Sequence, residues 1–100
     1  MKVVSIVNYK VKPGCSDEFI AAFDAPGGIS PYANIQKLIQ ISETAFLSFC
    51  EVDDVDKAVE KEDSGINWLD RFELLLEKYE DGSRTDSFSG LVVHEFEKNN

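Results

Sequence analysis

Long hydrophobic runs are absent from this sequence. Nothing in its 100 residues approaches the roughly 18 consecutive apolar residues that a membrane-spanning helix needs. The mostly apolar run at residues 3–7 is also too short for the core of a signal peptide. We therefore expect a soluble protein in the cytoplasm, with no membrane as a partner.

Basic residues are scarce. Ten lysines and arginines stand against 19 aspartates and glutamates, which gives a formal net charge of −9. A surface of this sign repels phosphate backbones and anionic lipid headgroups. Nucleic acid is therefore not an expected partner.

The residues that most often bind metals and nucleotides are also few. One histidine, His94, and two cysteines, Cys15 and Cys50, do not make a zinc site of the usual kind, so no metal is predicted. An expected extended strand would separate the two cysteines by about 30 Å, too far for a disulfide. The pair Gly27-Gly28 is too short for a phosphate-binding loop.

Apolar residues, by contrast, are plentiful. They make up 43% of the chain, and 11% of it is aromatic, which is enough for a packed interior. At this length we expect one domain over residues 1–100, with a modest core and room for one site.

The spacing of apolar residues and of glycine and proline predicts the order strand, helix, two strands, helix, strand. This is the α+β order of a ferredoxin-like βαββαβ fold with a four-stranded antiparallel sheet. The expected first half is a strand over 3–12, a helix capped by Ser16 and stopped at Pro26-Gly27-Gly28, and a hairpin of strands over 35–41 and 45–50. A helical region then starts at Asp53 or Asp54, points Val55, Ala58 and Val59 inward, and breaks at Ser64-Gly65. A helix from Ile66 to Asp81-Gly82 and a strand over 87–97 complete the chain.

The expected sheet is apolar on both faces. In its first strand Val7 and Tyr9 point to one side and Val4 and Ile6 to the other. Right-handed crossovers place both helices on the same side, so the second apolar face would be exposed, which is unusual for a monomer. We therefore predict a two-fold homodimer that pairs sheet against sheet.

One short motif resembles a known family. Val11-Lys12-Pro13-Gly14 followed by Glu18-Phe19 resembles the end of the first strand and the start of the first helix in antibiotic-biosynthesis-monooxygenase-like members of the dimeric α/β-barrel superfamily, and the order of elements is similar over the whole chain. The resemblance implies a pocket between sheet and helices in each subunit. That superfamily includes cofactor-free quinone-forming monooxygenases, haem-degrading enzymes and muconolactone isomerase-like proteins.

Haem-degrading relatives use an asparagine on the first strand, a tryptophan on the second helix and a histidine later in that helix. Asn8 and Trp68 stand in comparable elements, but the only histidine, His94, falls on the expected last strand. Because the helical ligand is missing, haem is not expected, and no cofactor is predicted.

Three residues are candidates for catalysis: Asn8, His94 and Trp68. His94 is either a general base, since imidazole titrates near neutral pH, or a structural histidine of the sheet. Trp68 is either a pocket residue or part of the aromatic core. Asn8 interrupts an apolar strand, where a buried amide needs partners, or it lies at a solvated strand end. Tyr9 and Tyr32 are possible phenol donors.

Two function classes stay open, and the sequence does not decide whether the protein is an enzyme. The first is cofactor-free oxygenation of an aromatic or quinol-like compound, with His94 or a tyrosine assisting deprotonation and Asn8 holding the anion. The second is non-catalytic binding of an apolar ligand such as a fatty acid. A structural dimer with a filled interior is a third possibility. The expected pocket lining is aromatic, comprising Tyr9, Phe46, Phe49, Trp68, Phe72 and Phe88.

Overall fold

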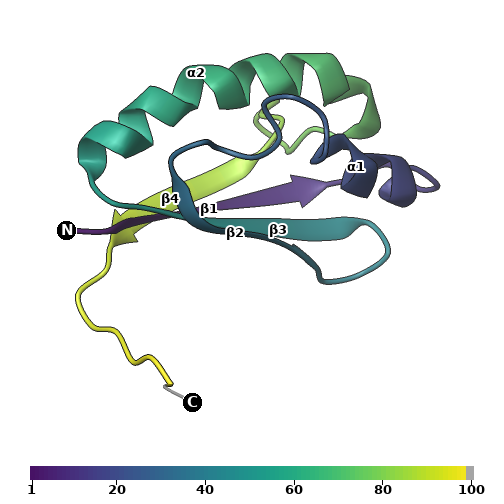
Figure 1. The fold of residues 1–100 in the computed structure, drawn as a ribbon. Coiled ribbons are helices and arrows are strands. Elements are labelled where there is room, and N and C mark those ends of the chain that lie inside the picture. Colours follow the sequence, from purple (N-terminus) through teal and green to yellow (C-terminus); the bar gives the residue numbers. More distant parts are fainter. Residues whose placement is uncertain (99–100) are drawn as a thin grey trace.

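Four antiparallel strands form one sheet, and both helices cover the same side of it (Figure 1). The computed structural model describes residues 1–98, without the side chains of 61–64. The strand order β2-β3-β1-β4 confirms the predicted ferredoxin-like α+β fold. The elements are β1 (Val3–Lys10), α1 (Ser16–Ala22), β2 (Ala33–Gln40), β3 (Ala45–Val52), α2 (Val55–Phe72), the 3-10 turn η1 (Glu73–Leu75) and β4 (Asp86–Leu91).

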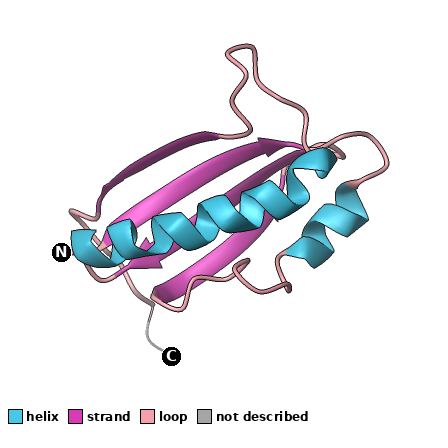
Figure 2. Cartoon of the chain, turned by 90° about the horizontal axis from the view of Figure 1, so that it is seen from above, coloured by secondary structure: helices cyan, strands magenta, loops and turns pink. Residues whose placement is uncertain are grey.

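The two-residue period of the strands divides the sheet into two chemically different sides. Seen from above, α2 runs along the sheet and α1 lies beside one end of α2 (Figure 2). We call the side beneath them the helix-facing side. The other side, which no helix covers, is the open face; it comprises Val4, Ile6 and Asn8 of β1, Ile35, Lys37 and Ile39 of β2, Leu47, Phe49 and Glu51 of β3, and Asp86, Phe88 and Gly90 of β4.

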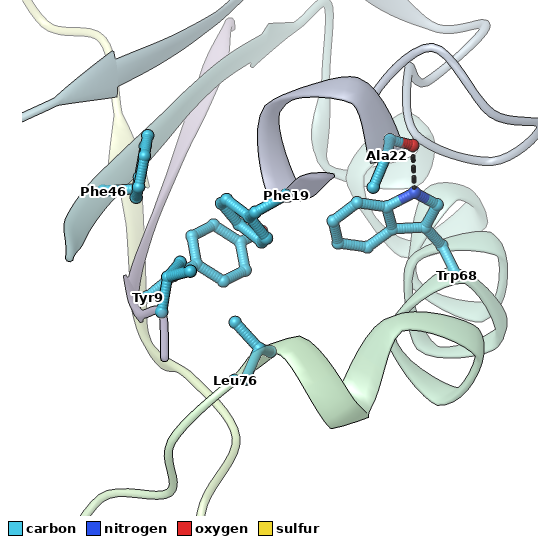
Figure 3. Packing of buried hydrophobic residues seen from close by; sticks show 7 residues of the cluster. Tyr9, Phe19, Ala22, Phe46, Trp68 and Leu76 are labelled. Atoms are coloured by element: carbon cyan, nitrogen blue, oxygen red, sulfur yellow. Dashed lines mark hydrogen bonds between the residues drawn. The ribbon is translucent and has the colours of Figure 1, made fainter. Parts of the chain in front are cut away.

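An aromatic core fills one end of the helix-facing side (Figure 3). Phe19 of α1 is fully buried and lies 5.0 Å from the Tyr9 ring and 5.1 Å from the Phe46 ring, measured between centroids. Trp68 of α2 packs on Phe23 at 4.6 Å. Burial of side chains of this size contributes roughly 1.5–3 kcal/mol each, so this cluster fixes both helices on the sheet.

The two helices begin differently from one another. Of the two predicted starting residues, Asp53 and Asp54, it is Asp54 that caps α2, and its carboxylate accepts a 2.9 Å hydrogen bond from the backbone N–H of Lys57. Ser16 was expected to cap α1, but Cys15 holds the cap position without a side-chain bond. The Ser16 hydroxyl instead donates to the carbonyl oxygen of Glu43, so it ties α1 to the β2–β3 turn.

The predicted break at Ser64-Gly65 is wrong, because α2 runs without interruption from Val55 to Phe72. A glycine inside a helix costs only about 1 kcal/mol, which the burial of Trp68 further along the same helix offsets. Val55 and Val59 were expected to point inward, yet both are more than half exposed.

The end of the second helix was also predicted wrongly. Instead of continuing to Gly82, the chain leaves α2 at Phe72 and becomes extended at Leu76. Leu76 pairs with Val11 beyond the end of β1, and the Glu77 N–H donates to the Lys10 carbonyl at 2.8 Å. A tertiary contact thus replaces the last turns of the expected helix.

The last strand is shorter than predicted. β4 ends at Leu91, opposite Val3, and the only later backbone bond in the described chain runs from the Val92 N–H to the Lys2 carbonyl at 2.9 Å. Residues 93–98 therefore lie outside the sheet, and His94 with them. None of the described helices is long and apolar enough to span a membrane.

Candidate functional site

A cavity of about 360 Å³ lies between the helix-facing side of the sheet and α2. This volume falls within the range of small-molecule sites. Its floor comes from β1, β3 and β4, its roof from α2, and one wall from the loop after α1. The lining residues are Ser5, Val7, Tyr9, Phe23, Gly27, Gly28, Ser30, Gln36, Ser48, Cys50, Gly65, Ile66, Trp68, Leu69, Thr85 and Ser87.

The cavity exists because small side chains occupy inward positions of the sheet. Ser48 and Ser87 flank Val7 from the two neighbouring strands, and Cys50 lies opposite Ser5. At the other end of the same side, Tyr9 and its neighbours are large and fill the space. Hydroxyl and thiol side chains are too short to reach α2, so a gap stays beneath it.

Tyr9 stands at the boundary between the aromatic core and the cavity. Only 6% of its surface is exposed, and its phenol shares a hydrogen bond with the Ser48 side chain. Burial raises the pKa of Tyr9 above its ordinary value, while the Ser48 bond lowers it to a smaller extent. Tyr9 is therefore a neutral phenol at physiological pH, suited to hydrogen bonding with a ligand oxygen and unsuited to accept a proton.

The side chain of Gln36 holds the loop wall in place. Its Nε2 donates to the Gly28 carbonyl at 2.7 Å, and its Oε1 accepts from the Ser30 N–H at 2.9 Å. Both ends of one amide thus bind the same loop. Gly28 is needed there, because a Cβ at this position would overlap the backbone of Phe23.

Trp68 forms part of the roof and joins it to the loop. Its indole Nε1 donates to the Ala22 carbonyl at 2.9 Å, and one turn later Arg71 donates to the carbonyl of Pro26. The loop after α1 is therefore bonded to α2 on one side and to Gln36 of β2 on the other.

No charged side chain lines the cavity among the residues whose side chains are described. The polar lining consists of serine and threonine hydroxyls, one phenol and one amide, which donate and accept hydrogen bonds without carrying charge. In residues 1–98, leaving aside the side chains of 61–64, no three histidine, cysteine or acidic residues come together as metal ligands. Cys15 and Cys50 are not joined by a disulfide.

The predicted aromatic lining is divided by the sheet. Tyr9 and Trp68 line the cavity. Phe46 and Phe72 lie on the same side but pack within or against the core. Phe49 and Phe88 are on the open face, where both are register partners of Ile6. They do not reach the cavity.

Two of the three catalytic candidates also lie elsewhere. Asn8 is on the open face, and its amide donates to the Asp86 carbonyl at 3.3 Å. His94 is exposed beyond the end of β4. Because Asn8 lies on the open face and Trp68 lines the cavity on the other side of the sheet, the two candidate residues are not brought together.

The prediction from sequence missed the polar lining, namely Ser5, Ser48, Ser87 and Gln36. A signal for the serines was present, since Ser5 has the inward parity of Val7, and Ser48 that of Phe46. A hydroxyl among inward apolar residues marks a place where the core is not filled. Gln36 gave no such signal, because its partners come from a loop.

Comparisons with solved structures show the same fold. Rv0793 from Mycobacterium tuberculosis is 14% identical with a TM-score of 0.73, over 95% of this chain and 98% of that one. A protein from Nitrosomonas europaea, provisionally named an antibiotic biosynthesis monooxygenase, is 14% identical with a TM-score of 0.75, over 93% and 91%.

SnoaB from Streptomyces nogalater, described as a cofactor-independent oxygenase, is 10% identical with a TM-score of 0.68, over 97% and 98% of the two chains. No protein-family model and no curated protein sequence matches the chain. At these identities the likeness is one of fold, and at that level it confirms the predicted resemblance to antibiotic-biosynthesis-monooxygenase-like proteins.

Proposed function

We propose that this protein binds an uncharged or weakly acidic aromatic compound in the cavity under α2 and oxygenates it without a cofactor. The observation that supports binding is the cavity itself, with an aromatic wall at Trp68 and Phe23 and a hydroxyl-bearing floor at Ser48 and Ser87. A flat ring with oxygen substituents matches both surfaces. The oxygenation is proposed by analogy with SnoaB, which shares the fold.

The proposed reaction needs no external reductant. A phenol with a hydrogen para to its hydroxyl reacts with O₂; one oxygen atom enters the ring, the other leaves as water, and the ring becomes a quinone. The phenol supplies all the electrons, and two of its hydrogens end in the water. In this scheme the Tyr9 phenol, supported by Ser48, donates a hydrogen bond to the substrate oxygen.

The proposal gives no catalytic role to His94 or Asn8. His94 is exposed outside the sheet, and Asn8 lies on the side of the sheet opposite the cavity. Because Tyr9 has a raised pKa and no described lining side chain is charged, the substrate would have to enter already ionised or lose its proton to water. We therefore expect turnover to follow the acidity of the phenol itself.

Binding and turnover are tested with 1-naphthol and 1,5-naphthalenediol as probes, because each has a hydrogen para to a hydroxyl. Trp68, the single tryptophan, reports occupancy by fluorescence. Ser87→Phe should fill the cavity and weaken binding at least about tenfold, or 1.4 kcal/mol. Ser89→Phe is the matched control, since Ser89 is on the same side of β4 but does not line the cavity. No probe binding, or equal loss in both variants, contradicts the site.

An oxygen electrode then separates the enzyme from a simple binding protein. Oxygen uptake with either probe that depends on the wild-type protein and falls in Ser87→Phe supports oxygenation. Binding without uptake overturns the enzymatic part of the proposal and leaves the site intact.

Non-catalytic binding of an apolar ligand, such as a fatty acid, is the alternative. It requires no general base, and no carboxylate or imidazole is among the described lining residues. Palmitate is the probe for this case. Quenching of Trp68 by palmitate with the same dependence on Ser87, together with no oxygen uptake from the phenols, would support the alternative.

A homodimer through the open face belongs to the same proposal. In the single chain this face exposes several large apolar residues, with Ile39 at 45% and Phe88 at 60%. Such a patch marks a contact surface. We expect sedimentation at micromolar concentration to give the mass of a dimer. Phe88→Lys should raise the dissociation constant of this dimer at least about a hundredfold, which corresponds to 2.7 kcal/mol. Leu74→Lys is the control, because Leu74 is 83% exposed but lies in η1.

Cytoplasmic location remains a prediction from the sequence.

A further inference from the structure

Gly65 lies inside α2, where neither the backbone nor the packing requires a glycine. The helix runs without interruption from Val55 to Phe72, so the backbone at Gly65 has a conformation that any residue adopts. A glycine there weakens the helix relative to alanine. Close packing does not explain it either, because a Cβ at this position would meet no atom of another element within 4 Å. The two common structural reasons for a glycine are therefore absent.

The helix rests on the sheet at two places, one on each side of Gly65. Seen from above, α2 runs along the sheet (Figure 2). Ala58 packs against the small buried cluster that contains Val52, and Trp68 belongs to the aromatic core. Ten residues of helix separate these two contacts, which corresponds to about 15 Å. Gly65 lies in the span between them, above the cavity.

The helical period places Gly65 on the cavity side of α2. It precedes Trp68 and Leu69 by three and four positions, so the three residues share one face of the helix. All three line the cavity. The next residue, Ile66, also lines it but is 51% exposed, and it therefore marks the edge of the opening. A side chain at position 65 would occupy space that now belongs to the cavity.

We propose that Gly65 is the specificity-determining residue of the cavity, because its missing side chain leaves room in the roof for a compound larger than one aromatic ring. This rests on the binding of an aromatic compound proposed above. The wall at Trp68 and Phe23 and the hydroxyls of the floor hold the first ring. The part of the compound that extends from there along α2 lies under Gly65. The glycine thus gives up helix stability in exchange for space.

The binding test compares phenol with 1-naphthol. The chain has one tryptophan, so the indole N–H of Trp68 gives a single NMR signal, whose shift reports occupancy even when binding is weak. Gly65→Leu should weaken the binding of 1-naphthol at least about tenfold and that of phenol less than about threefold. Gly65→Ala should have an intermediate effect. Asn67→Leu is the matched control, because Asn67 is exposed on the same helix and does not line the cavity.

Quenching of Trp68 fluorescence by acrylamide tests the same residue without a bound phenol. Acrylamide acts by collision and needs no affinity for the protein. Because Trp68 is only 3% exposed and lines the cavity, the quencher reaches it through the cavity. Gly65→Leu should therefore lower the quenching constant below that of the wild type and of Asn67→Leu. It should also raise the melting temperature, since leucine favours the helix and buries apolar surface.

The outcomes separate the role of Gly65 from the proposed function. Equal quenching in all forms, an equal loss of phenol and 1-naphthol binding, or the same loss in Asn67→Leu overturns the role of Gly65 and leaves the site standing. A melting temperature of Gly65→Leu below that of the wild type also overturns it, because the glycine would then be structural. If the wild type binds neither phenol nor 1-naphthol, the proposed function fails, while reduced quenching in Gly65→Leu still supports Gly65 as the residue that limits the size of entering compounds.

Discussion

The indole nitrogen of Trp68 donates a 2.9 Å hydrogen bond to the carbonyl oxygen of Ala22, across 46 positions of sequence. This bond joins the C-terminal third of α2 to the end of α1. The same side chain packs on Phe23 and Phe72 and lines the cavity. The aromatic core and the candidate site thus share one residue, so the position of the roof depends on the packing of the core.

Trp68→Phe should lower the free energy of unfolding by about 2 kcal/mol. One hydrogen bond contributes about 1 kcal/mol, and a smaller ring leaves a gap of similar cost. The Ala22 carbonyl oxygen still accepts a hydrogen bond from the Ala25 N–H at 3.1 Å, so the substitution does not leave it without a donor. Urea unfolding followed by circular dichroism measures the change. Leu74→Ala should stay within about 0.5 kcal/mol, and an equally small effect of Trp68→Phe would contradict the assigned role.

Two glycines should respond to alanine in opposite directions. At Gly28 the new methyl group would overlap the Phe23 backbone, whereas at Gly65 nothing lies within 4 Å. We expect Gly28→Ala to cost at least about 1–3 kcal/mol through overpacking. Gly65→Ala should stabilise α2 by roughly 0.5–1 kcal/mol. Thermal unfolding shows whether each variant is more or less stable than the wild type. A Gly65→Ala variant less stable than the wild type would argue against a continuous helix.

Gln36→Met should loosen the loop wall while keeping a side chain of similar length. It removes the bonds to Gly28 and Ser30, so we expect a loss of about 1–3 kcal/mol and faster hydrogen exchange at the Ser30 amide. Gln40→Met is the matched control, since Gln40 has the same parity on β2 but is exposed. If both variants exchange alike at Ser30, the clamp is not formed.

Stability should fall in alkali because of Tyr9. Its pKa is raised, mainly by burial, so between the ordinary tyrosine pKa of about 10 and the higher folded value the native state holds a proton that the unfolded state has lost. The protonated phenol therefore adds its full share to the free energy of unfolding below about pH 10, and this share is lost as the pH rises through the pKa of Tyr9 in the folded protein.

Tyr9→Phe has no such proton, so its stability relative to wild type should improve as the pH rises from about 9 to 11. Urea unfolding at several pH values measures this. The pKa of Tyr79 is also raised, by burial and by Asp86, but Tyr79 is less buried than Tyr9. Tyr79→Phe should therefore change the dependence of the unfolding free energy on pH less than Tyr9→Phe does. Parallel pH profiles for wild type and Tyr9→Phe would contradict the buried phenol.

Much of the fold could be predicted because local patterns and topology agree. The alternation in β1, the stop at Pro13-Gly14 and the Asp54 cap each act over a few residues, and the structure contains all three. Predictions failed where distant residues compete with local preference. Gly65 stays helical because α2 is held on the core, and Leu76 leaves the helical pattern because Val11 pairs with it.

The site was predicted less well, partly because residues that point to opposite faces of the sheet were assigned to the same pocket. Phe46 and Phe49 are three residues apart on one strand and therefore must point to opposite faces, yet both were assigned to the pocket. Asn8 and Tyr9, as neighbours, are likewise on opposite sides. Strict use of the two-residue period would have placed Ser5 and Ser48 in the cavity and Phe49 outside it.

The sequence by itself determined the order of elements, the two-sided apolar sheet and the side of β1 on which each residue lies, because these follow from turn residues and from strand periodicity. Only the tertiary structure decided where the interior is left unfilled and which loop closes it. Those outcomes depend on the summed sizes of side chains from β1, β3, β4 and α2, and on bonds such as that from Gln36 to Gly28. No local pattern encodes them.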